Sequence, residues 1–173
     1  MGAFVSPTEE LAEYAASRAD TAEPTVVVAG CGRAVTVAEL LEHGVDAYGF
    51  DVAPEPLAAA DVPRGRLLQC DLRDPDLLDR LRSDFDIGRI DVFYTEQVLS
   101  LLTPTEAERV TNRLREADAI DRCVHRIAPA APVGAQTGEI EATVRSVPEW
   151  QAACDPDGRD VWLSDVDRLE TAE

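Results

Sequence analysis

The stretch VVVAGCGRAVTVAELLEHGVDAYGFD, residues 26–51, constrains the fold more than any other part of the chain. It opens with a run of β-branched residues that ends at a glycine, which is typical of a parallel strand buried on both faces. Apolar residues at helical spacing follow, and Gly44 is placed to end that helix. A second apolar run then completes a strand, helix, strand unit. Because such units need right-handed crossovers, the stretch predicts a parallel sheet.

The same alternation continues along the chain. Capping signals mark three further helices: Ser6 and Thr103 are each followed three residues later by Glu, and Asp74 precedes a proline. Between them, residues 65–72 and 89–96 are strand-like. We therefore predict an α/β fold, a single doubly wound and mostly parallel sheet with helices on both faces. At 173 residues, 45% of them hydrophobic, the chain is long enough for one domain, residues 1–173.

Three parts of that domain are predicted. Residues 1–23 hold an N-terminal helix, residues 24–118 the repeated βα units, and residues 119–173 a shortened C-terminal part. Residues 119–127 have apolar residues at helical spacing, but their position after a helix favours a fifth strand. Beyond them we predict a loop of small residues and prolines, a short helix at VPEWQAACD and a last strand at RDVWLSD. GEIEATVRSV could contain one more strand.

The charge balance limits the partners. With 34 acidic and 16 basic residues, all 16 of them Arg, the formal net charge is −18. Such a surface is typical of a salt-loving source, because about 1 M salt screens charges beyond roughly 3 Å; the alternative is an acidic mesophile. The net charge disfavours nucleic acid as a partner, since that affinity comes mainly from neutralising phosphates.

The remaining composition argues for a simple intracellular protein. The four cysteines are widely spaced, with no C-x-x-C pair and only two histidines, so their spacing suggests neither a metal site nor a disulfide framework. No apolar run approaches the ~20 residues of a membrane span, and the N-terminus lacks the pattern of a secretory signal. We expect a cytoplasmic location and no membrane association.

Ligands of such sheets bind at the carboxyl ends of the strands. After the first predicted strand, Gly30 and Gly32 let backbone amides approach a ligand. Asp51, after the second strand, suits the two hydroxyls of a ribose, although a solvated capping carboxylate is the alternative. Asp71, after the third, could accept from an adenine amine or simply pair with Arg73. After the fourth strand, Thr95, Glu96 and Gln97 are expected to reach the centre of the cleft, the alternative being ordinary loop polarity.

In this order and at these intervals, VVVAGCGRA, YGFDVAPE, LLQCDLRD and IDVFYTEQVLSLLTP resemble the four cofactor motifs of class I S-adenosylmethionine-dependent methyltransferases, over roughly residues 8–118. The resemblance implies a Rossmann-like methyltransferase fold and S-adenosyl-L-methionine as cofactor. We expect a small-molecule acceptor, because no part of the sequence indicates a recognition domain and the net charge repels nucleic acid. It implies that the turn wraps the methionine, that Asp51 binds the ribose, and that Asp71 binds the adenine. The implied cofactor-binding residues are Ala29, Gly30, Cys31, Gly32, Arg33, Asp51, Val52, Asp71, Leu72 and Glu96. Glu96 is also the candidate catalytic base.

The sequence departs from the family pattern at three places. Val28 stands where an acidic residue is usual, Ala34 stands where a third glycine is usual, and the C-terminal part is short. Glu96 could replace the missing carboxylate at the methionine ammonium group. The departures also leave two alternatives open: a catalytically weak or inactive binding or regulatory subunit, and an NAD-binding oxidoreductase. Against the latter, Val35 stands at the third glycine of G-x-G-x-x-G. A second copy of the chain or a partner subunit could supply the substrate cap.

Overall fold

A six-stranded sheet forms the centre of the computed structural model, which describes residues 6–127, 146–164 and 167–169. Its strand order is β3-β2-β1-β4-β5-β6, and every neighbouring pair is parallel. The strands are β1 (Thr25–Ala29), β2 (Asp46–Asp51), β3 (Leu67–Gln69), β4 (Ile90–Glu96), β5 (Ile120–Ile127) and β6 (Val161–Ser164). This confirms the doubly wound, parallel α/β fold.

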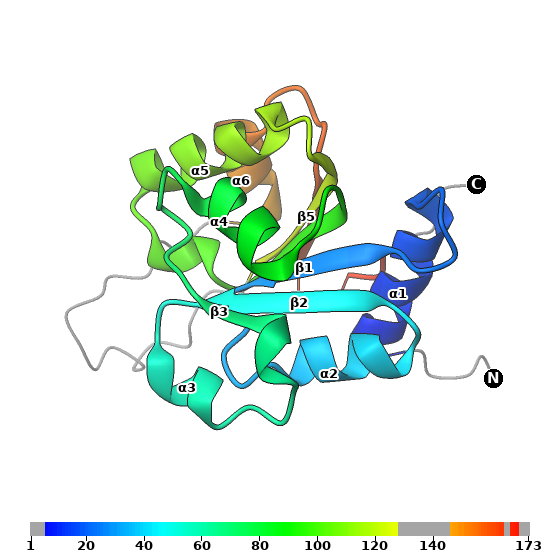
Figure 1. Cartoon of the computed structure of the whole chain (residues 1–173). Helices are drawn as coiled ribbons and strands as arrows, with labels where there is room; N and C mark the ends of the chain where they lie inside the picture. The colour runs from blue at the N-terminus through cyan, green and yellow to red at the C-terminus, as the bar shows by residue number, and fades with distance from the viewer. Residues whose placement is uncertain (1–5, 128–145, 165–166, 170–173) are drawn as a thin grey trace.

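Helices cover both faces of this sheet (Figure 1). The helices are α1 (Pro7–Arg18), α2 (Val35–Glu42), α3 (Pro54–Ala58), α4 (Leu77–Phe85), α5 (Pro104–Glu116) and α6 (Val147–Cys154), with short 3-10 turns η1 (Arg64–Arg66) and η2 (Leu99–Leu101). Side chains of α4, α5 and α6 share one buried cluster with one face of the sheet, and those of α1, α2 and α3 share another with the opposite face. The sheet is therefore the middle layer of three.

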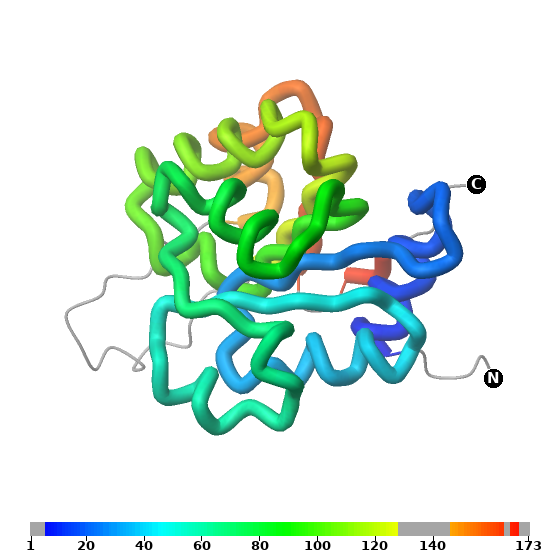
Figure 2. Tube along the Cα trace, in the orientation of Figure 1, coloured from blue at the N-terminus to red at the C-terminus, as the bar shows by residue number. Residues whose placement is uncertain are grey.

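The C-terminal elements complete the core. Trp150 of α6 is fully buried, and its ring stacks on that of Trp162 in β6, with 6.5 Å between the centroids. The last described residues lie beside α1 in Figure 2, where the Leu169 amide donates to the Glu10 carboxylate at 3.1 Å. Both tryptophans thus serve the core of this domain, and the C-terminal part is packed into it.

Most predicted elements are confirmed, but some boundaries are wrong; the third strand, for example, covers only Leu67–Gln69 of the predicted residues 65–72, because Arg64–Arg66 form a 3-10 turn. Residues 120–127 are a strand, and Ser6 and Thr103 cap their helices through the amides three residues on. The helix predicted to start behind Asp74 instead begins at Leu77, because the Asp74 carboxylate accepts from the Asp76 amide at 2.9 Å and makes a separate turn before the helix. The loop and the extra strand considered around GEIEATVRSV fall almost wholly outside the described residues.

No helix of the described residues is long and apolar enough to cross a membrane.

Candidate functional site

The strand order reverses between β1 and β4, and this reversal locates the candidate site. In open α/β sheets the ligand crevice lies outside the carboxyl ends of the strands at such a switch point. The glycine turn follows β1, and Glu96 ends β4. The fold therefore places the predicted site where a ligand is expected.

The glycine turn is held against the neighbouring strand. The amides of Gly30 and Cys31 both donate to the Phe50 carbonyl of β2, at 3.0 and 3.1 Å. Gly30 has φ +69°, and a Cβ there would lie 2.9 Å from the Cβ of Val98. Gly32 has φ +54° and open space where its Cβ would be. Packing thus requires the first glycine, whereas the second leaves a bare backbone surface that a ligand could approach.

Ala34, at the position where a third glycine is usual, adopts the conformation that glycine favours. Its φ of 60° is left-handed, its side chain is fully buried, and its amide donates to the Cys31 carbonyl at 2.8 Å. The left-handed region costs an L-residue roughly 1–2 kcal/mol. The turn therefore keeps its shape despite the departure, and α2 starts directly after it.

Asp51 is fixed in place by two backbone amides. Its Oδ2 accepts from Gly32 N–H at 2.8 Å and its Oδ1 from Ala53 N–H at 2.9 Å. Each oxygen keeps a second lone pair for another donor. The next side chain, Val52, is 61% exposed and gives the same edge an apolar surface. A fixed carboxylate, an open glycine and an apolar surface fit the ribose and base of an adenosine.

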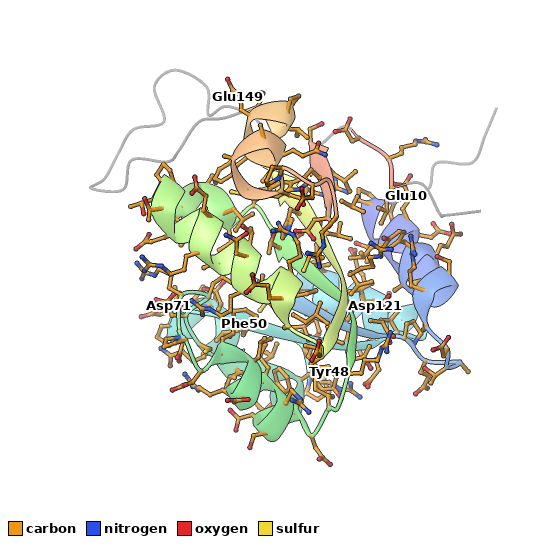
Figure 3. All side chains as sticks on the ribbon, turned by 90° about the horizontal axis from the view of Figure 1, so that it is seen from above. Glu10, Tyr48, Phe50, Asp71, Asp121 and Glu149 are labelled. Carbon is orange, nitrogen blue, oxygen red and sulfur yellow. The ribbon has the colours of Figure 1, made fainter. Side chains whose placement is uncertain are left out.

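Asp71 pairs with Arg73, which was the alternative interpretation of this residue. Arg73 reaches both carboxylate oxygens, at 2.7 Å for Nη2 to Oδ2 and 3.0 Å for Nε to Oδ1, and its Nη1 lies 3.3 Å from Glu106. These hydrogen bonds from Arg73 hold the pKa of Asp71 below its usual range. Figure 3 shows Asp71 at the opposite side of the molecule from Asp121, which lies near the start of β5. The carboxylate is at the expected edge, and an adenine amine would share it with Arg73.

The side chain of Leu72 faces the hydrophobic core and is only 5% exposed. Ala29 is also fully buried, and Arg33 is exposed. Any ligand contact of Leu72 or Ala29 would therefore be made by the backbone.

Glu96 is half-buried at the end of β4 and is anchored by α2. Its Oε1 accepts from the Thr36 hydroxyl at 2.9 Å. Burial raises the pKa of Glu96, with a smaller contribution from Glu39, although the Thr36 hydrogen bond and the charge of Arg126 oppose the rise. Thr36 was not predicted as a site residue; its position in the first turn after the glycine turn was the available signal.

The Cys31 thiol lies close enough to Asp51 at the end of β2 and Glu96 at the end of β4 for both charges to affect its pKa. Burial raises its pKa to about 12, and the charges of Asp51 and Glu96 add to the rise. The structure thus brings the glycine turn, Asp51 and Glu96 together.

The prediction that Thr95 reaches the cleft is wrong. Thr95 is fully buried, and its Oγ1 lies 2.8 Å from Nδ1 of His125 on β5. Alternation along β4 turns Thr95 to the α5 and α6 side, while its neighbour Glu96 bonds to α2 on the other side. Gln97 is exposed at φ 57°.

A cavity of about 320 Å³ lies at the other edge of the sheet, where β1, β2 and β4 begin. Of its carboxylates, Asp46 pairs with Arg66, and Asp91 accepts from the Thr25 amide at 2.8 Å and lies 3.7 Å from Arg89. The amino ends of the strands are not where sheets of this kind bind ligands, so this cavity does not compete with the carboxyl edge.

Comparisons with solved structures agree on the architecture. A TehB-like S-adenosylmethionine-dependent methyltransferase from Corynebacterium glutamicum matches 85% of this chain and 71% of its own, with TM-score 0.58 and 18% identity. The magnesium protoporphyrin IX methyltransferase of Synechocystis, solved with bound S-adenosylhomocysteine, matches 84% and 68%, with TM-score 0.59 and 15% identity. The chain has the class I methyltransferase fold.

A third structure with this methyltransferase fold, an S-adenosylmethionine-dependent methyltransferase from Mesorhizobium loti, matches 88% of this chain and 81% of its own, with TM-score 0.54 and 16% identity. Three other matched methyltransferases are longer, and the chain spans only 40%, 49% and 46% of them. No family model and no curated protein sequence matches the chain. At such identities the comparisons establish the fold alone.

Proposed function

We propose that the protein is an S-adenosylmethionine-dependent methyltransferase that acts on a small-molecule acceptor. The observation that carries this proposal is the Asp51 carboxylate, held by the Gly32 and Ala53 amides beside an open glycine turn at the switch point of the sheet. A carboxylate fixed there can accept both hydroxyls of a ribose without rearrangement. The methyltransferase fold supports the same ligand.

In this proposal the backbone of residues 29–33 lies along the methionine part of the cofactor. Val52 packs against the adenine, and Asp71 and Leu72 face its edge. Position 28, where the family usually has an acidic residue, is a fully buried valine here. It therefore offers no carboxylate to hold the methionine ammonium group. Glu96, anchored by Thr36 at the end of the neighbouring strand, takes that role.

The cofactor would supply an electrophilic methyl group on a sulfonium, so this chain mainly has to orient an acceptor in line with it. Where the acceptor carries a proton, Glu96 is the one described carboxylate at the end of β4 that could accept it. The acceptor is assigned to small molecules because a net charge of −18 repels nucleic acid.

A catalytically inactive binding subunit remains the second candidate, and two observations favour it. The buried Val28 removes a common carboxylate, and Arg73 occupies Asp71. Both candidates would bind the cofactor; only the first would turn it over. Restoration of turnover by a partner that co-purifies with the chain would favour the subunit.

The first test is a calorimetric titration with S-adenosylmethionine, S-adenosylhomocysteine and NAD, in multimolar KCl to screen the acidic surface. We expect the first two to bind and NAD not to bind. Asp51→Ala would remove the two charge-assisted hydrogen bonds that we propose to the ribose hydroxyls. Each is worth about 1.5–3 kcal/mol, so the affinity for the S-adenosyl compounds should fall at least 100-fold. Asp118→Ala, an exposed aspartate beyond α5, is the control. Binding of NAD alone, or unchanged affinity in Asp51→Ala, would refute the cofactor assignment.

Glu96→Gln tests the ammonium contact separately. It removes the charge while leaving an acceptor for Thr36, so affinity for both S-adenosyl compounds should fall roughly 10- to 100-fold, the equivalent of one charge-assisted hydrogen bond. Because burial raises the pKa of Glu96, the wild-type affinity should also decline on acidification at a higher pH than an ordinary glutamate would allow. Equal affinities of variant and wild type across pH would exclude this role.

A further inference from the structure

Three potential metal ligands meet on the face of the sheet opposite Glu96. Cys123 and His125 are two residues apart on β5 and point to the same side, and Asp160 directly precedes β6. The three ligand atoms lie within 4.8 Å of one another. Exposure is 3% for Cys123 and zero for His125, and 4% for the Asp160 side chain. The trio is therefore a shielded cluster of sulfur, nitrogen and oxygen donors.

The surroundings of His125 and Asp160 already hold their ligand atoms in direction. His125 Nε2 lies 3.0 Å from Asp160 Oδ2, and its Nδ1 lies 2.8 Å from Thr95 Oγ1. Arg115 donates to the same Asp160 oxygen at 3.1 Å. Metal-binding histidines and carboxylates are usually held by outer hydrogen bonds of the kind that Thr95 and Arg115 make here.

Of the three potential ligands, only the Cys123 thiol takes no part in these hydrogen bonds. It makes no hydrogen bond to any residue that the structure describes, whereas the Cys31 and Cys70 sulfurs each have a carbonyl partner. A cavity of about 100 Å³ is lined by Cys123 and Asp160, together with Arg115, Arg122 and Arg159. It has room for a water molecule.

We propose that Cys123, His125 and Asp160 bind a zinc ion, with a water molecule from this cavity as the fourth ligand. Zinc accepts this mixture of donors in tetrahedral geometry, with ligand bonds of about 2.0–2.3 Å. The His125 and Asp160 donors must move apart by a few tenths of an ångström from their present hydrogen-bond distance of 3.0 Å. Counting the buried side chains alone, Asp155, Asp160 and a thiolate with the Arg115 cation would carry two negative charges, which a divalent ion neutralises; Arg122 and Arg159 lie nearer to solvent.

Binding has a defined proton balance. A thiol must lose its proton to bind zinc, so forming the zinc to sulfur bond releases the proton of Cys123 to solvent. At a pH where His125 is neutral, its single ring proton moves from Nε2, which then binds the zinc, to Nδ1, which then donates to Thr95 Oγ1. The net release is one proton for each zinc, so affinity should rise with pH. The ion would join β5 to the start of β6 and stabilise the C-terminal part.

The test uses Co²⁺ as a spectroscopic substitute for zinc, on the full chain after treatment with chelator and in excess Mg²⁺ to occupy surface carboxylates. We expect one Co²⁺ per chain, a near-ultraviolet band from thiolate to cobalt charge transfer, and its loss when Zn²⁺ is added. Titrations of Zn²⁺ in buffers of different ionisation enthalpy should report one proton released.

Cys123→Ala should lose the band and the proton release, whereas Cys70→Ala, another buried cysteine outside the cluster, should keep both. Zinc should raise the Tm of the wild type and of Cys70→Ala only. A folded wild type without the band, or a band that persists in Cys123→Ala, would overturn the proposal. None of these results depends on S-adenosylmethionine binding.

Discussion

Arg115→Met is expected to destabilise the protein by about 3–5 kcal/mol, because it leaves two buried carboxylates without their cation. The Arg115 side chain is 9% exposed; its Nε lies 3.4 Å from Asp155 and its Nη2 lies 3.1 Å from Asp160. Its Nη2 also donates to the Cys154 carbonyl at 2.7 Å. The free energy of unfolding from denaturant titrations at constant KCl measures the loss.

The control for this prediction is Arg89→Met. Arg89 pairs with Asp91 and Asp121 but is 58% exposed, so its loss should cost no more than about 1 kcal/mol. Burial alone raises the pKa of Asp160, but the hydrogen bond and charge of His125, with Arg115, outweigh it and bring the pKa below its usual value. The wild type should therefore lose this stabilisation as the pH falls below about 4. A cost for Arg115→Met no larger than that of Arg89→Met would contradict the network.

Gly49→Ala is expected to damage both stability and the candidate site. A Cβ on this β2 residue would lie 2.8 Å from Cys31 Sγ and 2.8 Å from Val37 Cγ2. Overpacking of this kind costs roughly 1–3 kcal/mol, and here it falls on the glycine turn and the first turn of α2. Binding of S-adenosylmethionine should weaken with it, since the atoms that move belong to the turn.

Thermal unfolding and calorimetric titration measure these two effects. Gly65→Ala is the matched control, because a Cβ at Gly65 meets nothing within 4 Å. That variant should stay close to the wild type in both measurements. If Gly49→Ala matched the control in stability, β2 and the turn would be less tightly packed than the structure indicates.

The order of elements could be predicted from the sequence because each carries its own local signal. The β-branched run before Gly30 marked a buried parallel strand, and Thr103 with Glu106 marked a helix start. Residues 120–127 had a helical apolar pattern and still formed a strand, because a strand buried on both faces is apolar irrespective of period. The place of these residues after a helix, in a chain that alternates strands and helices, was therefore the signal that predicted a strand correctly.

Contacts between distant segments could not be predicted in this way. The sequence predicts Thr95 in the cleft because it stands at the carboxyl end of the fourth strand, yet its hydroxyl meets His125 thirty residues away. The partners of His125 come from β4 and from the residue before β6, so only the folded sheet brings them together. Cys123 and His125, spaced as neighbours on one face of a strand, were the local signal for the cluster, but Asp160 has none.

The carboxylate of Asp51 has two tasks at once, since it closes the glycine turn through Gly32 and is the group proposed to hold the ribose. Any substitution there therefore loosens the backbone as well as removing a ligand contact. Over evolutionary time, a descendant of this chain that gave up its nucleoside ligand would still be under pressure to keep an acceptor at this position. An aspartate at position 51 is thus weaker evidence of activity in relatives of this protein than a glutamate at position 96, which has no second backbone duty in the described structure.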